Sequence, residues 1–197
     1  MKGQREEAWM AIRLDLGTIT DEDLLRLSER NPGYQFERTA DGRLLVTPTG
    51  MESGRRSLEI AYQLKRWNEQ TGLGIVFDSS AGFRLPDGSL FSPDASWIPK
   101  ERWEALRPEE REKFGAFCPD AVFEVLSSSQ VLEELREKMR VYIRNGARIA
   151  VLIDPYARVV EIYRPGQDPE LHRAPAHVSL SPELPDFALD LRPIFEG

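Results

Sequence analysis

The sequence predicts an α+β fold in which a mixed central β-sheet is flanked by helices. Three features predict it: a capped helix early in the chain, a run of short strands joined by tight turns, and a later strand–helix–strand unit. The chain has 197 residues, of which 41% are hydrophobic and 30% charged, as in ordinary globular domains. We therefore expect a single domain over residues 1–197, with residues 1–16, which are charged and weakly patterned, as a loosely ordered arm.

The first half of the chain carries signals for a helix, a hairpin and a second helix. Thr20 followed by three acidic residues is typical of a helix N-terminus and predicts a helix over residues 20–29. Asp41-Gly42 is a strong turn signal and predicts a hairpin between strands over residues 34–39 and 43–47. Apolar residues at helical spacing predict the second helix over residues 53–70.

The second half alternates between strand and helix signals. Residues 100–114 are charged and indicate a helical insertion broken at Pro108. Residues 121–126 form the most strand-like run in the sequence, and a helix with one apolar face is expected over residues 131–145. Further strands are expected over residues 74–77, 82–85, 92–98, 148–154 and 159–163, and a late apolar segment covers residues 187–191.

Composition disfavours several classes of protein. A single cysteine, Cys118, excludes an internal disulfide and a multi-cysteine zinc site. The two histidines, His172 and His177, lie together near the C-terminus, which disfavours a histidine-rich metal site or a serine–histidine hydrolase. No apolar run approaches the roughly 20 residues that span a bilayer, and no secretory signal is recognised, so we expect no membrane partner and a cytoplasmic location.

The net charge and the local charge pattern point in different directions on binding of nucleic acid. The net charge of −7 counts against a broad basic surface of the kind that nucleic-acid-binding proteins usually carry. Basic residues do cluster on the helix over residues 131–145, where Arg136, Arg140 and Arg144 are candidate phosphate contacts. Acidic residues alternate with them, so an ordinary solvated face is the alternative.

Glu124 is the first candidate for chemistry because it lies within an apolar strand. Side chains alternate along a strand, so Val122, Glu124 and Leu126 share one face. A carboxylate between apolar neighbours loses much of its hydration energy unless a partner, such as a bound cation, compensates. The alternative is an edge strand on which Glu124 faces water.

Asp94 is the second candidate and follows Pro93 in an earlier predicted strand. Pro-Asp pairs occur elsewhere in this chain as turn elements, so the dipeptide alone is weak evidence. The order of Pro-Asp, a spacer, Glu124 in an apolar strand and then a helix is more specific.

An ordered set of short motifs extends this pattern over about residues 20–195. They include Gly33-Tyr34-Gln35-Phe36-Glu37-Arg38, Ser92-Pro93-Asp94-Ala95-Ser96-Trp97, Glu124-Val125-Leu126-Ser127, Glu137-Lys138-Met139 and Leu152-Ile153-Asp154-Pro155. The set resembles the PD-(D/E)XK phosphodiesterase superfamily and, within it, a widespread bacterial family of restriction-type endonucleases.

The resemblance implies a restriction-endonuclease-like core and metal-dependent hydrolysis of phosphodiester bonds, with DNA as the expected nucleic acid. It implies that Asp94 and Glu124 hold Mg²⁺ or Mn²⁺, since such hard cations prefer oxygen ligands. The cation would polarise the phosphodiester and lower the pKa of an attacking water. Many nucleases of this architecture cut duplexes as dimers, so a homodimer is expected by analogy alone.

Leu126 departs from the superfamily pattern, in which a lysine lies two residues after the strand glutamate. Lys138, on the following helix, is the substitute that the closer family implies. It lies at the border of the apolar face of that helix, one turn before Tyr142. The resemblance therefore gives Asp94, Glu124 and Lys138 as catalytic residues, and the alternative for Lys138 is a solvated side chain.

A third acidic ligand is expected beside Asp94 and Glu124. Glu37 matches the glutamate of the family's hairpin motif and is the first choice. Glu59, on the helix over residues 53–70, is the alternative, although its position on that helix is typical of an exposed acid.

Two other functions stay open at this point. With Leu126 in the lysine position and an acidic charge, the domain could be a catalytically inactive nuclease-fold module that binds nucleic acid or protein. A hydrolase acting on sugars would instead use two carboxylic acids about 5–10 Å apart, aromatic platforms and no metal.

Overall fold

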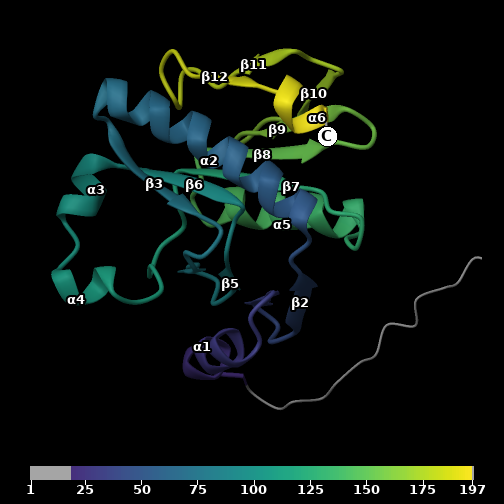
Figure 1. The fold of residues 1–197 in the computed structure, drawn as a ribbon. Coiled ribbons are helices and arrows are strands. Elements are labelled where there is room, and N and C mark those ends of the chain that lie inside the picture. The colour runs from purple at the N-terminus through teal and green to yellow at the C-terminus, as the bar shows by residue number, and fades with distance from the viewer. Residues whose placement is uncertain (1–18, 197) are drawn as a thin grey trace, which may run out of the picture.

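The computed structural model describes residues 19–196, and the predicted N-terminal arm over residues 1–16 lies outside them. Its centre is a six-stranded mixed sheet with the strand order β10-β9-β8-β7-β6-β3 (Figure 1). The strands are β3 (Gly74–Asp78), β6 (Ala95–Pro99), β7 (Ala121–Val125), β8 (Ile149–Asp154), β9 (Val159–Tyr163) and β10 (Glu170–Arg173). Only β7 and β8 pair in parallel. The predicted mixed sheet with flanking helices is confirmed.

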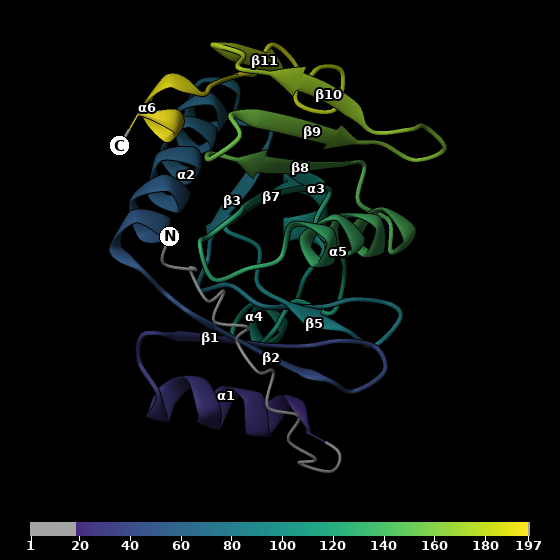
Figure 2. The same ribbon diagram turned by 90° about the vertical axis from the view of Figure 1, so that its right-hand side faces the viewer.

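A long helix covers each face of this sheet, as Figure 2 shows for α2 (Met51–Thr71) and α5 (Leu132–Arg144). On the α2 side, Ile60, Leu64 and Trp67 pack into a core cluster with the odd-numbered positions of β7. On the α5 side, the cluster contains Val122 of β7, Leu126 just after it, and the buried face of α5, including Leu135, Met139 and Tyr142. The alternation of side chains along β7 therefore divides the core into two layers.

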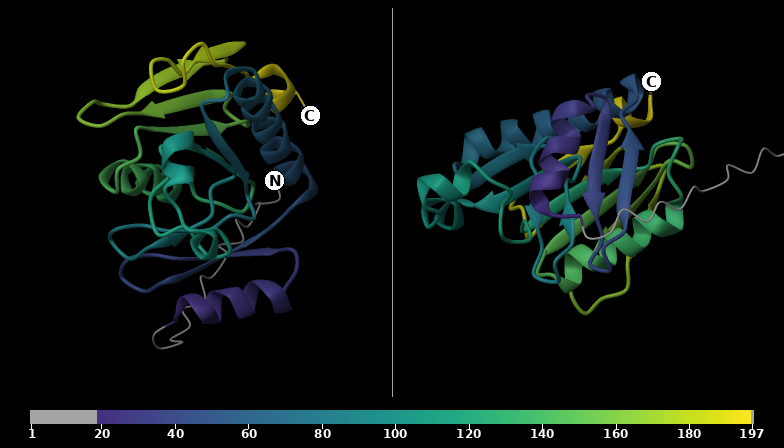
Figure 3. Two further views of the ribbon diagram at one scale, coloured as in Figure 1. Left: turned by 90° about the vertical axis from the view of Figure 1, so that its left-hand side faces the viewer. Right: turned by 90° about the horizontal axis from the view of Figure 1, so that it is seen from below.

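A smaller sheet and the first helix form the end of the molecule far from β11, as the left view of Figure 3 shows. The sheet has the order β2-β1-β5-β4. Its strands are β1 (Tyr34–Arg38), β2 (Leu44–Pro48), β4 (Phe83–Arg84) and β5 (Leu90–Phe91). Helix α1 (Asp21–Arg30) begins with a capping box between Thr20 and Asp23, which satisfies backbone N–H groups in its first turn. The hairpin predicted around Asp41-Gly42 is present.

The C-terminal segment is more structured than the sequence suggested. It contains β11 (His177–Ser179), β12 (Ala188–Asp190) and α6 (Arg192–Phe195), of which the sequence indicated only the late apolar segment. Its buried residues join the core cluster on the α2 side: Val178, Leu180, Leu184, Phe187, Leu189, Leu191 and Ile194. This segment thus closes one layer of the core.

Two other expectations are corrected in detail. The strand predicted over residues 92–98 begins only at Ala95, so Asp94 lies just before β6. The insertion over residues 100–114 forms two short helices, α3 (Lys100–Glu104) and α4 (Pro108–Arg111), with Pro108 in the first turn of the second. Among residues 19–196, no helix has the length and apolar character required to cross a membrane.

Candidate active site

Glu124 lies in the middle of the central sheet. Strand β7 pairs with β6 on one side and β8 on the other, and Glu124 is only 3% exposed. The alternative of a water-facing carboxylate on an edge strand is therefore wrong. Val122 and Leu126, on the same face, are buried in the cluster beneath α5.

Asp94 lies beside Glu124 at the end of the sheet. Ala95 of β6 pairs with Phe123 of β7, so the next position in this antiparallel register places Asp94 opposite Glu124. Beyond the last paired residues of β6 and β7, the side chain of Asp94 accepts a hydrogen bond from the backbone of β7. Its Oδ2 accepts a hydrogen bond from the Val125 backbone N–H at 2.7 Å, and its Oδ1 accepts one from Ser57 Oγ at 2.7 Å. Both carboxylate oxygens of Asp94 are therefore oriented by neighbours from β7 and α2.

Lys138 reaches the same site from helix α5. Its Nζ lies 2.6 Å from Glu124 Oε1 and 2.9 Å from each carboxylate oxygen of Glu37. The Lys138 side chain is 8% exposed, so the alternative of a solvated lysine is wrong. Leu126, at the usual lysine position, is instead buried in the apolar cluster under α5. A lysine from another element thus contacts the strand glutamate.

Glu37 contacts Lys138 and does not line the hollow that Asp94 and Glu124 share. It lies on β1, is 5% exposed, and receives both Lys138 and the Ser92 backbone N–H, the latter at 2.6 Å from Oε1. These three contacts already satisfy much of its hydrogen-bonding capacity. The geometry therefore favours a role for Glu37 in holding Lys138.

Burial and charge crowding perturb the ionisation of this cluster. Burial raises the pKa of Glu124 to about 8, and the neighbouring carboxylates Asp94 and Glu37 add to this against the opposing effect of Lys138. Burial also raises the pKa of Asp94, although its hydrogen bonds from Ser57 and Val125 oppose this. Desolvation alone would lower the pKa of Lys138, but Glu124 and Glu37 raise it above its ordinary value, so the amine stays charged.

Tyr142 completes the cluster, and sequence reasoning did not give it a role at Glu124. It lies one turn after Lys138 on α5 and donates a hydrogen bond from its hydroxyl to Glu124 Oε1 at 3.0 Å. Burial and the adjacent Glu124 carboxylate raise its pKa well above the ordinary value, so the phenol keeps its proton. Glu124 Oε1 therefore receives two donors from one face of α5, and the spacing of 138 and 142 is the sequence signal for it.

A hollow of about 470 Å³ opens beside the two carboxylates. Asp94 and Glu124 line it, together with residues of the β1–β2 hairpin, the start of α2 and the segment after β7. Glu37 and Lys138 lie behind this lining and do not form part of it. Glu124 thus lines an opening of the size of a small-ligand site and also contacts a buried lysine that does not line it.

The alternative third acid, Glu59, lies away from this opening. It accepts a hydrogen bond from Gln63, on the same helix, and it does not line the hollow. Within residues 19–196, no three side chains of the types Asp, Glu, His or Cys are arranged to hold a metal ion by themselves. Asp94 and Glu124 are the two carboxylates that the structure brings together at the opening.

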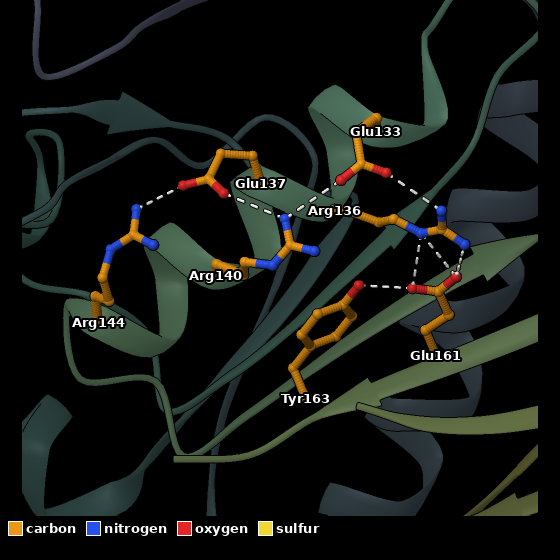
Figure 4. Close-up of polar contacts among 7 residues, drawn as sticks. All are labelled: Glu133, Arg136, Glu137, Arg140, Arg144, Glu161 and Tyr163. Carbon is orange, nitrogen blue, oxygen red and sulfur yellow. Dashed lines mark hydrogen bonds and ion pairs between the residues drawn. The ribbon is translucent and has the colours of Figure 1, made fainter. Parts of the chain in front are cut away.

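A further buried carboxylate, Glu161 on β9, was not singled out from the sequence. Arg136 of α5 approaches it with two guanidinium nitrogens, the closest at 2.6 Å, and the Tyr163 hydroxyl donates to it at 2.6 Å (Figure 4). Burial alone would raise the pKa of Glu161, but these donors hold it below its ordinary value. This is a satisfied structural ion pair.

The basic face of α5 is committed to the protein itself. Arg140 contacts Glu133 and Glu137, Arg144 contacts Glu137, and Arg136 is held by Glu161, as Figure 4 shows. Arg140 and Arg144 form exposed ion pairs with acids of the same helix, and Arg136 pairs with the buried Glu161, so an ordinary charged face is favoured over a phosphate-binding stripe.

The mixed sheet between two helices, with buried carboxylates and a lysine at one end, defines a protein with a restriction-endonuclease-like fold. The chain belongs to the Uma2 family, whose description is "Putative restriction endonuclease"; the family model matches residues 21–192. The predicted family is thereby confirmed, and membership supports a nuclease function in general.

A solved structure shows the same fold. It is described as a "putative nuclease belonging to DUF820 from Anabaena variabilis ATCC 29413". The two chains are 21% identical and superpose with a TM-score of 0.72 over 90% of this chain and 97% of the other. No curated protein matches the chain.

Proposed function

We propose that this protein is a metal-dependent endonuclease that hydrolyses phosphodiester bonds in DNA, with a single nuclease-like domain. The observation that carries the proposal is the buried contact of Lys138 with Glu124, next to an opening lined by Glu124 and Asp94. A buried lysine beside two carboxylates with raised pKa is typical of a catalytic site rather than of a packing core.

Asp94 and Glu124 are the residues that would hold a divalent cation. Three carboxylates, those of Glu37, Asp94 and Glu124, influence one another and a single ammonium, that of Lys138. Fully ionised, these four groups sum to a charge of −2 (three negative, one positive), which one divalent cation would neutralise. Mg²⁺ commonly takes only one or two protein carboxylates and completes its shell with water and phosphate oxygens, so two acids suffice. When bound, it supplies Lewis-acid polarisation of the phosphodiester and a more acidic water.

The surrounding side chains hold the two carboxylates in place. Ser57 and the Val125 N–H fix the two oxygens of Asp94, and Tyr142 and Lys138 fix Oε1 of Glu124. Oε2 of Glu124 receives no hydrogen bond from the residues that the structure describes, and it is the oxygen left for a ligand. Fixed donors of this kind reduce the reorganisation needed during reaction.

Lys138 provides a positive charge that does not depend on pH near neutrality. Since its pKa is raised, its amine acts as an electrostatic donor and not as a general base. We infer that it stabilises negative charge that develops on the phosphoryl group. Glu37 keeps the ammonium in place through both of its carboxylate oxygens.

The rival function is a nuclease fold that binds nucleic acid or protein without cleavage. The observation that favours it is that each α5 arginine forms an ion pair with an acidic residue of the protein, so that helix has no unpaired basic row. The buried lysine–glutamate contact favours the enzyme, because a charged group inside the fold costs stability that a scaffold does not need to lose.

Nicking of supercoiled plasmid DNA in Mg²⁺ or Mn²⁺ tests the proposal. Asp94→Asn, Glu124→Gln and Lys138→Met should each lower the rate by at least about 100-fold, as for the loss of a fixed catalytic group. Glu161→Gln is the matched control, because it alters a buried strand glutamate of the same sheet face and should leave nicking unchanged. Wild-type protein that cleaves neither the plasmid nor single-stranded DNA in either metal would favour the non-catalytic function.

A further inference from the structure

The hollow beside Asp94 and Glu124 has unusual walls for a site that acts on DNA. Twenty of the residues within 19–196 line it, and none of these is lysine or arginine. Nine are serine or threonine and two are glutamine, and the only charged ones are Asp94 and Glu124. A site that grips the backbone of a duplex needs several basic contacts to phosphates, and this lining offers none.

The chemistry of these walls suits a nucleobase and its sugar. Hydroxyl and amide groups can donate and accept hydrogen bonds at the edge of an unpaired base, without any charge. The volume of about 470 Å³ falls in the range of sites that enclose one small ligand. A paired and stacked base inside a duplex cannot enter such a hollow without leaving its helix.

One aromatic ring at the hollow has an open face. Tyr34, on β1, is 52% exposed and lines the opening. Its ring centre lies 6.4 Å from that of Phe36, which is half-buried and packs with Phe114 on the cluster of α1. The Tyr34 ring is tilted against Phe36 and half exposed at the opening, so it offers an aromatic surface on which a base can stack.

The wall that carries Tyr34 is tied to the segment that carries Asp94. Gln35 donates a hydrogen bond from Nε2 to the Ser92 backbone oxygen at 2.5 Å, and the Ser92 N–H bonds to Glu37. Gln35, which follows Tyr34 in β1, is thus bonded to Ser92, which lies two residues before Asp94 in the chain. Tyr34, Asp94 and Glu124 line the same hollow, so a base stacked on Tyr34 would lie in the opening that the two carboxylates share.

We propose that this hollow binds an unpaired nucleotide of single-stranded DNA, stacked on Tyr34, and that duplex DNA is a poor ligand. That the ligand is DNA rests on the proposed nuclease function, and the inference adds that the DNA is single-stranded. Binding of RNA of the same sequence is one of the outcomes that the test distinguishes.

Fluorescence anisotropy of a labelled single-stranded DNA oligonucleotide, in EDTA so that no cleavage occurs, tests the proposal. The fully paired duplex of the same sequence and the matching RNA are used as further probes. We expect the single strand to bind at least about tenfold more tightly than the duplex, and its affinity to change little with salt, because few counterions are released.

Variants of two matched tyrosines identify the platform. Tyr34→Ala should weaken binding of the single strand by about 5- to 150-fold, the effect of losing one stacked base, while Tyr34→Phe should bind like wild type. Tyr62→Ala is the control, since Tyr62 is 53% exposed on α2 and lies outside the hollow.

Four outcomes overturn the inference: equal or tighter binding of the duplex, tighter binding of RNA than of DNA, equal loss of binding in the Tyr34→Ala and Tyr62→Ala proteins, or no binding of any of the three probes. Tyr34-dependent binding of the single strand without cleavage in Mg²⁺ or Mn²⁺ would support the inference while removing the nuclease function. Nicking of duplex DNA that is unaffected by Tyr34→Ala would support the nuclease function while removing the inference about Tyr34 and the single strand.

Discussion

Two glutamates in the central sheet occupy nearly equivalent positions and have opposite electrostatic surroundings. Glu124 of β7 pairs across the sheet with Leu152 of β8, and Leu152 pairs with Glu161 of β9. The two carboxylates therefore lie in one row on one face, each 3–4% exposed, and helix α5 supplies a cation to both. Lys138 serves the first and Arg136 the second.

The difference lies in how many carboxylates share each cation. Glu161 has Arg136 and the Tyr163 hydroxyl, which hold its pKa below the ordinary value. Glu124 shares Lys138 with Glu37 and lies near Asp94, and burial with these neighbours raises its pKa to about 8. One pair is balanced, whereas the other carries an excess of negative charge beside an opening. This excess is what distinguishes a candidate cation site from a structural ion pair.

Removing the basic side chain that pairs with each glutamate should give the largest difference in stability and in DNA cleavage. Lys138→Met leaves two buried carboxylates unpaired and should lower the free energy of unfolding by about 3–5 kcal/mol, while DNA cleavage falls by at least about 100-fold. Arg136→Met should cost about 1–3 kcal/mol, because Arg136 is partly exposed and Tyr163 still bonds Glu161. Its cleavage rate should stay within about twofold of wild type. Denaturant unfolding and nicking rates measure both, and equal losses of activity would contradict the comparison.

The two glutamates should also impose opposite dependences of stability on pH. For Glu161, whose pKa is lowered on folding, the stabilisation is present above the unfolded pKa and is lost as pH falls through the folded pKa. The gap in unfolding free energy between wild type and Glu161→Gln should therefore narrow from about pH 6 to about pH 3.

For Glu124, whose pKa is raised to about 8, the folded protein holds a proton that the unfolded chain releases above its ordinary pKa of 4.5. Wild type should lose stability relative to Glu124→Gln as pH rises from about 5 to about 8, by on the order of 1–3 kcal/mol. Urea unfolding across this range measures the trend. If wild type instead gained stability relative to Glu124→Gln, Lys138 would lower the pKa of Glu124 by more than burial, Asp94 and Glu37 raise it.

Glu37→Gln should separate a positioning role from a ligand role. If Glu37 holds Lys138, its loss should reduce cleavage by about tenfold while the affinity for Mn²⁺ stays within about threefold. If Glu37 were itself a ligand, removing it should weaken Mn²⁺ binding by more than the roughly 10- to 100-fold that is typical of losing an outer-shell partner. Calorimetric titration beside single-turnover cleavage distinguishes the two results.

The smallest contrast concerns the tyrosine that bonds each glutamate. Tyr142→Phe and Tyr163→Phe each remove one buried hydrogen bond to a carboxylate and should cost about 1–2 kcal/mol of stability. Only Tyr142→Phe should change Mn²⁺ affinity, because only Glu124 faces the opening. A shift in Mn²⁺ affinity in the Tyr163→Phe protein would indicate that the two sites are coupled through α5.

Much of the fold follows from local signals in the sequence. Asp41-Gly42 specifies the hairpin, and Gly72, which adopts a left-handed φ of 65°, ends α2. Strands β5, β10 and β11 and helix α6 were not predicted. Each has four residues or fewer, which is too short for a periodic pattern in the sequence, and the strands among them are determined by their pairing partners.

The candidate site was partly accessible from the sequence, and Glu161 shows why the rest was not. Glu161 lies in the strand Val-Val-Glu-Ile-Tyr, which has the same acid-in-apolar pattern as the strand of Glu124. The pattern identifies a buried carboxylate in both cases but not its partner. The position of Lys138 on the helical wheel made a contact with Glu124 predictable. The contact of Ser57 with Asp94, 37 residues away along the chain, had no signal in the sequence.

Calorimetric titration of Mn²⁺ into wild type, Glu124→Gln and Glu161→Gln is the most direct test of the central claim, that excess carboxylate at Glu124 creates a cation site. The account predicts one bound cation in wild type and in Glu161→Gln, with binding lost in Glu124→Gln. Binding that survives in Glu124→Gln, or that disappears equally in both variants, would contradict it.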